Sequence, residues 1–234
     1  KRTLKWDALS GEILKQYTNY NSPVSVIALS KNNKFLACAN ENGVLILNSS
    51  DFGVYKKIDI TKPKQVKFSE DDKLLYIANE EFGKEKIFVY DMNNGSLLNL
   101  VAGIYGPESM GIGKDKIVVS NYKELVCIDL NMKKSILTIP KDSFKISGAC
   151  INKAGTQIAY GLEDGNIYLR TFDGNKIKDG NGVPVNFEKK HTGSINQLQF
   201  SDDGKFLITA GNDWTSKLDI VSTGKEVRVG KSAW

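Results

Sequence analysis

The chain of 234 residues carries 32 basic against 27 acidic residues, a formal net charge of +5, and 41% of its residues are hydrophobic. This length and composition suffice for a substantial core, in one large domain or two smaller ones. The basic residues include only three arginines and form no long block, and no apolar run approaches the roughly 18 residues that cross a bilayer; a soluble protein with a solvated, lysine-rich surface is expected.

In chain order, the first predicted elements are two short strands within KRTLKWD and EILKQY. A unit of four runs follows over about residues 21–60, namely VSVIALS, KFLACA, VLILN and GVYKKIDI, each bounded by polar turn residues. Units of the same order follow over about residues 61–104, 105–141, 142–190 and 191–231. No segment has useful helical periodicity, so the pattern predicts an all-β chain.

The units repeat with a period near 40 residues. Five segments align, beginning at residues 30, 69, 113, 152 and 201: SKNNKFLACANENG, SEDDKLLYIANEEFG, GKDKIVVSNYKE, NKAGTQIAYGLEDG and SDDGKFLITAGND. Four short strands in each unit of this length are the pattern of a propeller blade. The first strands of the blades are expected near residues 24–30, 64–69, 107–113, 146–152 and 195–201.

Further motifs in these units resemble those of a known family. Trp6-Asp7 is followed by SGE, Tyr90-Asp91 by NNG, and HTGSINQLQFSDDGKFLITAGND at 191–213 by STGK. With Ile128-Asp129, these residues make the chain resemble WD40-repeat β-propellers. The resemblance implies four-stranded antiparallel blades, about five of them full after a partial one at 1–20, as a whole domain at 1–231 or as part of a six- or seven-bladed propeller.

The sequence supports one prediction for each end of the chain. The partial blade lacks its first two strands, and the resulting open strand edge would invite self-association. Residues 232–234, SAW, match the start of a streptavidin-binding affinity tag and are treated as a tag remnant outside the domain.

The lone histidine, His191, lies near Ser194 and Asp213 and raises the question of hydrolase chemistry. The resemblance implies instead that His191, Thr209 and Asp213 belong to a structural hydrogen-bond chain within the blade. The tryptophan that completes such a chain is replaced by Asp219. A structural role is the leading hypothesis, with a partner contact and catalysis as alternatives.

No cofactor or metal is expected from the sequence. One histidine and scattered cysteines give no cluster at zinc spacing, and the Asp/Asn-rich stretch 164–182 lacks the closing glutamate of a calcium loop. The three cysteines, Cys38, Cys127 and Cys150, lie in apolar runs and are read as free thiols. They favour a reducing compartment, and a cytoplasmic location is predicted.

By resemblance, the expected function is a non-enzymatic scaffold that binds other proteins through the loops on one face. An enzyme or small-ligand binder using the central channel is the first alternative, and binding of nucleic acid or an anionic surface is the second. Aromatic residues on the loops are the candidate partner contacts, with packing between blades as the alternative. They are Tyr20, Phe82, Tyr105, Tyr122, Phe144 and Trp214. Trp214 stands out because the matching turns carry Gly43 and Gly165.

Overall fold

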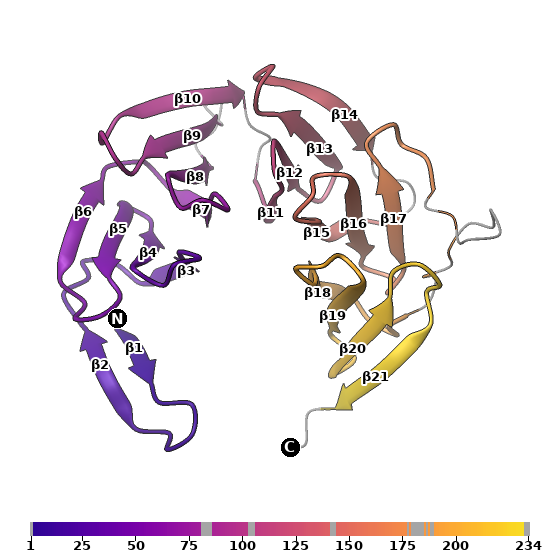
Figure 1. The fold of residues 1–234 in the computed structure, drawn as a ribbon, viewed down its shortest axis with the longest axis horizontal. Helices are drawn as coiled ribbons and strands as arrows, with labels where there is room; N and C mark the ends of the chain where they lie inside the picture. Colours follow the sequence, from indigo (N-terminus) through magenta and orange to yellow (C-terminus); the bar gives the residue numbers. More distant parts are fainter. Residues whose placement is uncertain are drawn as a thin grey trace. The chain divides into compact units, whose positions relative to one another are not determined.

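The computed structural model describes residues 2–80, 86–102, 106–140, 144–176, 178, 185, 187 and 190–231. Within these residues the chain forms 21 β-strands and no helix (Figure 1). No helix long and apolar enough to span a membrane is therefore found in the described part. The strands fall into two compact units, Lys1–Gly106 and Pro107–Trp234.

The first unit contains three antiparallel sheets, each with its strands in chain order. The first sheet has two strands, β1 (Thr3–Trp6) and β2 (Ile13–Tyr17). The second has β3 (Val24–Leu29), β4 (Phe35–Asn40), β5 (Gly43–Asn48) and β6 (Val54–Ile58). The third has β7 (Pro63–Phe68), β8 (Leu74–Asn79), β9 (Lys86–Asp91) and β10 (Leu97–Ala102).

The second unit also contains three antiparallel sheets. The first has β11 (Ser109–Ile112), β12 (Lys116–Ser120), β13 (Glu124–Asp129) and β14 (Lys134–Pro140). The second has β15 (Ile146–Ile151), β16 (Gln157–Leu162) and β17 (Ile167–Thr171). The third has β18 (Ile195–Phe200), β19 (Phe206–Gly211), β20 (Thr215–Ile220) and β21 (Glu226–Lys231).

The predicted fold class is confirmed, because the chain is all-β and four of its sheets have four antiparallel strands, as blades do. The predicted first strands coincide with β3, β7, β11, β15 and β18 to within two residues. The sheet of β15–β17 has three strands among the described residues. Residues 177–189, which follow β17 in the unit predicted at 142–190, lie mostly outside the described residues, so the fourth strand expected in this unit remains a prediction.

Local chemistry explains why the same hairpin recurs. The Ser30 hydroxyl accepts a hydrogen bond from the Phe35 amide at 2.9 Å, and Ser69 and Ser201 do the same for residues five positions later. Asn152 replaces the serine in the sheet of β15–β17, where its side-chain oxygen accepts from the Gln157 amide at 3.0 Å. These bonds satisfy the amide that begins the second strand and so fix the turn.

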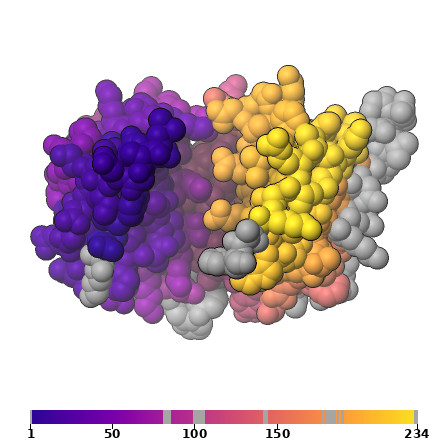
Figure 2. Space-filling view, turned by 90° about the horizontal axis from the view of Figure 1, so that it is seen from below, coloured from indigo at the N-terminus to yellow at the C-terminus, as the bar shows by residue number. Residues whose placement is uncertain are grey.

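The core lies between neighbouring sheets and is made mainly by second and third strands. Strand β4 packs its buried Ala37 and Ala39 against Val66 of β7, with Ile46 of β5 in the same cluster. Fourth strands are far more exposed, and every residue of β21 is exposed along the surface coloured yellow in Figure 2. The apolar middle strands thus hold the sheets together, while the first strands and the connecting loops carry more of the polar side chains.

A buried carboxylate joins the hairpin turns of two sheets. Both oxygens of Asp72 accept backbone hydrogen bonds at 2.7 Å, one from Lys31 and the other from Asn32. Asp72 itself has a φ of 58°, which asparagine also tolerates. We expect Asp72→Asn to lower the free energy of unfolding by about 1 kcal/mol, because the amide keeps one acceptor and loses the charge. Urea unfolding would measure this, and an unchanged stability would show that the bridge contributes nothing.

Candidate functional site

In the second unit, the loops that can bind a partner lie at one end of each sheet. In a four-stranded antiparallel sheet, the linker before the first strand and the turn between the second and third strands lie at the same end. We call this end of the second unit the loop face. It consists of residues 107–108, 121–123, 144–145, 163–166, 190–194 and 212–214.

Backbone hydrogen bonds tie these loops to one another. The Glu163 amide donates to the Lys145 carbonyl at 3.0 Å, and the His191 amide donates to the Gly165 carbonyl at 3.2 Å, which links two sheets. Gly165 has a φ of 84°, and a Cβ there would collide with the His191 carbonyl oxygen. Glycine is therefore required where the loop before β18 crosses the turn of the preceding sheet.

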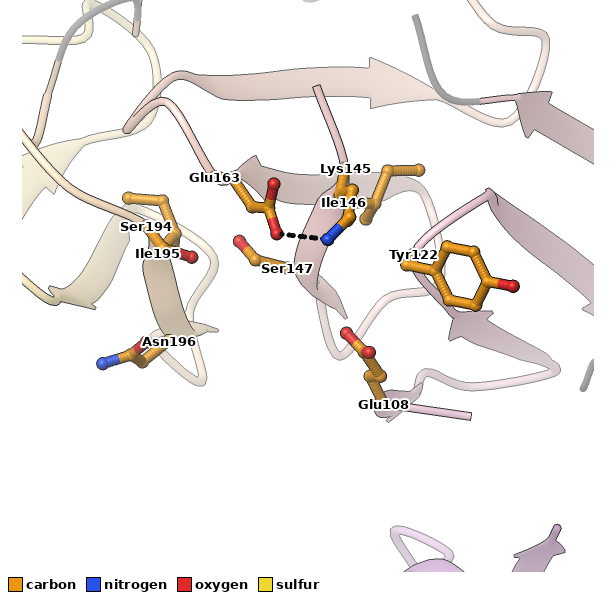
Figure 3. Close-up of a pocket in the computed structure, with 9 residues that line it drawn as sticks. All are labelled: Glu108, Tyr122, Lys145, Ile146, Ser147, Glu163, Ser194, Ile195 and Asn196. Carbon is orange, nitrogen blue, oxygen red and sulfur yellow. Dashed lines mark ion pairs between the residues drawn. The ribbon is translucent and has the colours of Figure 1, made fainter. Parts of the chain in front are cut away.

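A pocket of about 510 Å³ opens on this face (Figure 3). Two buried isoleucines, Ile146 and Ile195, lie at the starts of β15 and β18 and form its apolar part. Its other walls are mostly polar. They include Glu108, Tyr122, Lys145, Glu163, Ser194 and Asn196.

Among the described residues, the charged side chains that line the pocket are one lysine and two glutamates. Lys145 Nζ pairs with Glu163 Oε1 at 3.2 Å, and both side chains are about half exposed, so the pair adds little stability (Figure 3). Burial raises the pKa of the Glu108 carboxyl; the Lys145 ammonium lowers it in part, and the Glu163 carboxylate raises it again.

Trp214 stands on the turn beside this pocket. Its side chain is 67% exposed, and its φ of 62° lies in the left-handed region that favours glycine. The same turn is fixed to the pocket, because the Asn212 amide donates to the Ser194 carbonyl at 2.9 Å and Asn196 Nδ2 donates to Asn212 Oδ1 at 2.8 Å. The indole is therefore presented by a rigid turn.

The structure places the other predicted contact residues in different environments. Phe144 is exposed on the loop face, and Tyr122 is partly buried, with the Lys123 ammonium 5.4 Å from its ring centroid. Both remain candidate contacts. Phe82 and Tyr105 lie outside the described residues.

The prediction that Tyr20 is a surface contact is wrong. Tyr20 is buried, stacks edge-on against Tyr17 and shares a hydrogen bond of 2.7 Å with the hydroxyl of Thr3. Burial is the main reason that the pKa of its phenol is raised. The ring fills the space between β1 and the sheet of β3–β6, next to Cys38, and is not available to a partner.

The structure brings His191, Thr209 and Asp213 together inside the last sheet. His191 Nε2 lies 2.9 Å from the Thr209 hydroxyl, and Nδ1 lies 3.0 Å from Asp213 Oδ1. A carboxylate only accepts, so Nδ1 carries the proton of its hydrogen bond to Asp213. Sequence reasoning missed a fourth member, Thr215, whose hydroxyl donates to Asp213 Oδ1 at 2.7 Å.

This cluster is closed to a substrate. The His191 side chain has no exposed surface, and both ring nitrogens are engaged within the protein. Burial would raise the pKa of Asp213, but hydrogen bonds from His191, Thr215 and two backbone amides outweigh it and hold that pKa well below 3.8. The carboxylate therefore stays ionised and ties the linker before β18 to the turn before β20.

Asp219 has an unforeseen partner. It is fully buried, and its Oδ1 lies 2.8 Å from Lys190 Nζ, which also donates to the Gly224 carbonyl at 2.7 Å. The second oxygen of Asp219 has no hydrogen-bond partner among the described residues. The sequence marks Asp219 as unusual but gives no sign of Lys190, because the two lie 29 positions apart.

The three cysteines are buried and form no disulfide bond among the described residues, as read from the sequence. Burial raises the pKa of Cys127 to about 12 and also raises that of Cys38, so both are thiols at neutral pH. No group of three or more histidine, cysteine or acidic side chains that could hold a metal ion occurs among the residues that the structure describes.

Comparisons with known proteins agree with the repeat. The family model described as WD domain, G-beta repeat matches residues 182–218. The chain is 28% identical to WD repeat-containing protein 1 of Xenopus tropicalis over 129 residues, which cover 53% of this chain and 19% of that protein. It is 30% identical to WD repeat-containing protein 1-A of Xenopus laevis over 112 residues, 45% of this chain and 17% of that protein. The matched part is less than a fifth of either relative.

Proposed function

We propose that this chain, which matches the WD-repeat family model over residues 182–218, is a protein-binding module without enzymatic activity, and that it binds through the loop face of its second unit. Proteins built of WD repeats generally serve as interaction scaffolds. The loop face offers the mixture of exposed aromatic, charged and polar groups that protein interfaces use.

Trp214 is the observation that carries this proposal. A tryptophan in the left-handed region costs about 1–2 kcal/mol relative to glycine, which occupies the matching turns. The large exposed indole contributes less to the fold than a buried one, so its retention at such a position is best explained by a partner that covers it. Tryptophan is also among the residues most often found at the energetic centre of an interface.

The environments of the residues that could act in catalysis support a role without enzymatic activity. His191 is enclosed, and Cys38 and Cys127 are protonated thiols in the core. The partner class is other proteins. A cytoplasmic location remains a prediction that the three buried thiols favour.

The test is a pull-down from extract of the source organism, with quantified recovery of bound proteins. We expect Trp214→Gly to weaken binding by on the order of 2 kcal/mol, about 30-fold, while the melting temperature stays the same or rises slightly. Trp6→Ala is the matched control, because Trp6 is a similarly exposed tryptophan on β1 of the first unit. Loss of partners with the Trp6 variant alone, or a lower melting temperature with unaltered binding for the Trp214 variant, would contradict the proposal.

A further inference from the structure

First strands of this chain pack against the sheet that precedes them. In three sheets, the last residue of the first strand and the residue two positions earlier lie in one apolar cluster with the second strand of the preceding sheet. The clusters contain Val66 and Phe68 of β7 with Ala37 of β4, Ala149 and Ile151 of β15 with Val118 of β12, and Leu198 and Phe200 of β18 with Ala159 of β16. One side of a first strand is therefore normally covered by the sheet before it.

Strand β3 has the same two positions without such a cover. Ile27 is 58% exposed and Leu29 is 54% exposed, whereas Val26 and Ala28 pack against the cluster shared with the following sheet. Alternate residues of a strand point to opposite sides of its sheet. The exposed pair therefore lies on the side of β3 where a preceding sheet packs in the other cases.

The sheet before β3 has only β1 and β2 among the described residues, and these correspond to a third and a fourth strand. Asp7 Oδ1, just after β1, accepts from the amides of Leu9 and Ser10 at 2.9 and 2.8 Å. Asp91 and Asp129, which end the third strands β9 and β13, make the same two bonds to the residues two and three positions later. In the described chain, no first or second strand lies beside β1.

By correspondence with the other sheets, the free edge of β1 and the exposed side of β3 border the same place. The edge of β1 away from β2 pairs with no described strand, so its backbone groups can pair with an added strand (Figure 1). The exposed Asn33 has a φ of 58°, as Asp72 has at the matching position of the next sheet. There the Asp72 carboxylate accepts two amide hydrogen bonds from the preceding turn at 2.7 Å, so Asn33 is suited to accept from a turn as well.

From these observations we propose that an antiparallel β-hairpin of a partner protein completes this sheet. One strand of the hairpin pairs with the free edge of β1, and the hairpin packs its apolar side on Ile27 and Leu29. The occupant has two strands because β1 and β2 already hold the third and fourth positions, which leaves no room for the longer sheets of a second copy. Small residues should face β3, since Ala37 and Ala159 do so in the matching contacts.

The test uses the whole chain and a fluorescein-labelled peptide with the sequence of residues 146–162, carrying Cys150→Ser to prevent oxidation. This segment forms β15 and β16, and its Ala159 packs in one cluster with Leu198 and Phe200, which match the exposed pair of β3. We expect binding with a Kd on the order of 100 μM, because an isolated hairpin must also be ordered on binding. The same peptide with Ala159→Lys is the control and should bind at least about tenfold more weakly, because it brings a charge to the apolar contact.

Two variants of the chain locate the binding. Ile27→Lys should weaken binding of the peptide about tenfold, and Ile208→Lys, which adds the same charge at a similarly exposed isoleucine of the last sheet, should leave it unchanged. Because Ile27 is more than half exposed, its replacement should change the melting temperature by less than about 2 °C. The bound peptide should also slow hydrogen exchange at the amides of β1.

Three results would each overturn the hairpin site. They are no binding up to about 1 mM peptide, an equal effect of Ile27→Lys and Ile208→Lys, and β1 amides that are already protected in a dimer of the chain alone. This site lies in the first unit and goes beyond the proposed function of the loop face. Trp214→Gly should therefore leave peptide binding unchanged, and either proposal can fail without the other.

Discussion

Replacing Lys190 with methionine is expected to lower the local free energy of unfolding of the last sheet by about 3–5 kcal/mol. The reason is that the carboxyl group of Asp219, which is fully buried, would lose the one ammonium group that lies within ion-pair distance among the described residues, 2.8 Å away. Native-state hydrogen exchange at the amides of β20 measures this free energy directly.

A control and a rescue make this prediction specific. Lys57 and Asp59 pair at the same distance, 2.8 Å, but on the surface, so Lys57→Met should cost less than about 1 kcal/mol. The double variant Lys190→Met/Asp219→Leu removes both charges and should recover most of the loss. If Lys190→Met and Lys57→Met cost the same, the buried pair does not stabilise the sheet as inferred.

Replacing His191 with alanine is expected to lower the free energy of unfolding by about 1–3 kcal/mol, because Thr209 and Asp213 would be left with unsatisfied polar atoms beside a cavity. The amides of β19 and β20 should report the loss by hydrogen exchange, and partner binding should fall only in proportion to the folded fraction. An unchanged stability with abolished binding would instead assign His191 to the partner contact.

Local patterns account for what the sequence predicts well. The serine and asparagine residues that begin each hairpin act within five positions, so SKNNKF and SDDGKF are recognisable without any tertiary information. The turn that carries Trp214 is also recognisable from local sequence, because it lies between two clear apolar runs. The glycines at the matching positions of other units indicate that the backbone at Trp214 is left-handed, as the structure has it.

Long-range contacts account for the failures. Tyr20 follows the second predicted strand and looks like a loop aromatic, but Thr3, 17 positions earlier, supplies a hydrogen bond that holds it in the core. The pocket draws its walls from linkers and turns of three sheets, so no short motif marks it. Asp219 is a buried polar residue in an apolar strand. Such a residue indicates that a charged side chain from a distant part of the sequence lies close to it in space.

The most direct test of the account is hydrogen exchange of the chain with and without a protein recovered in the pull-down. We predict that protection on binding concentrates on the loop face, at residues 121–123, 144–145, 163–166 and 212–214, and that the Trp214→Gly variant loses this protection. Strand β1, which pairs only with β2 among the described residues, offers an open edge as the competing surface. Protection confined to β1 and β2, with the loop face unchanged, would contradict the account.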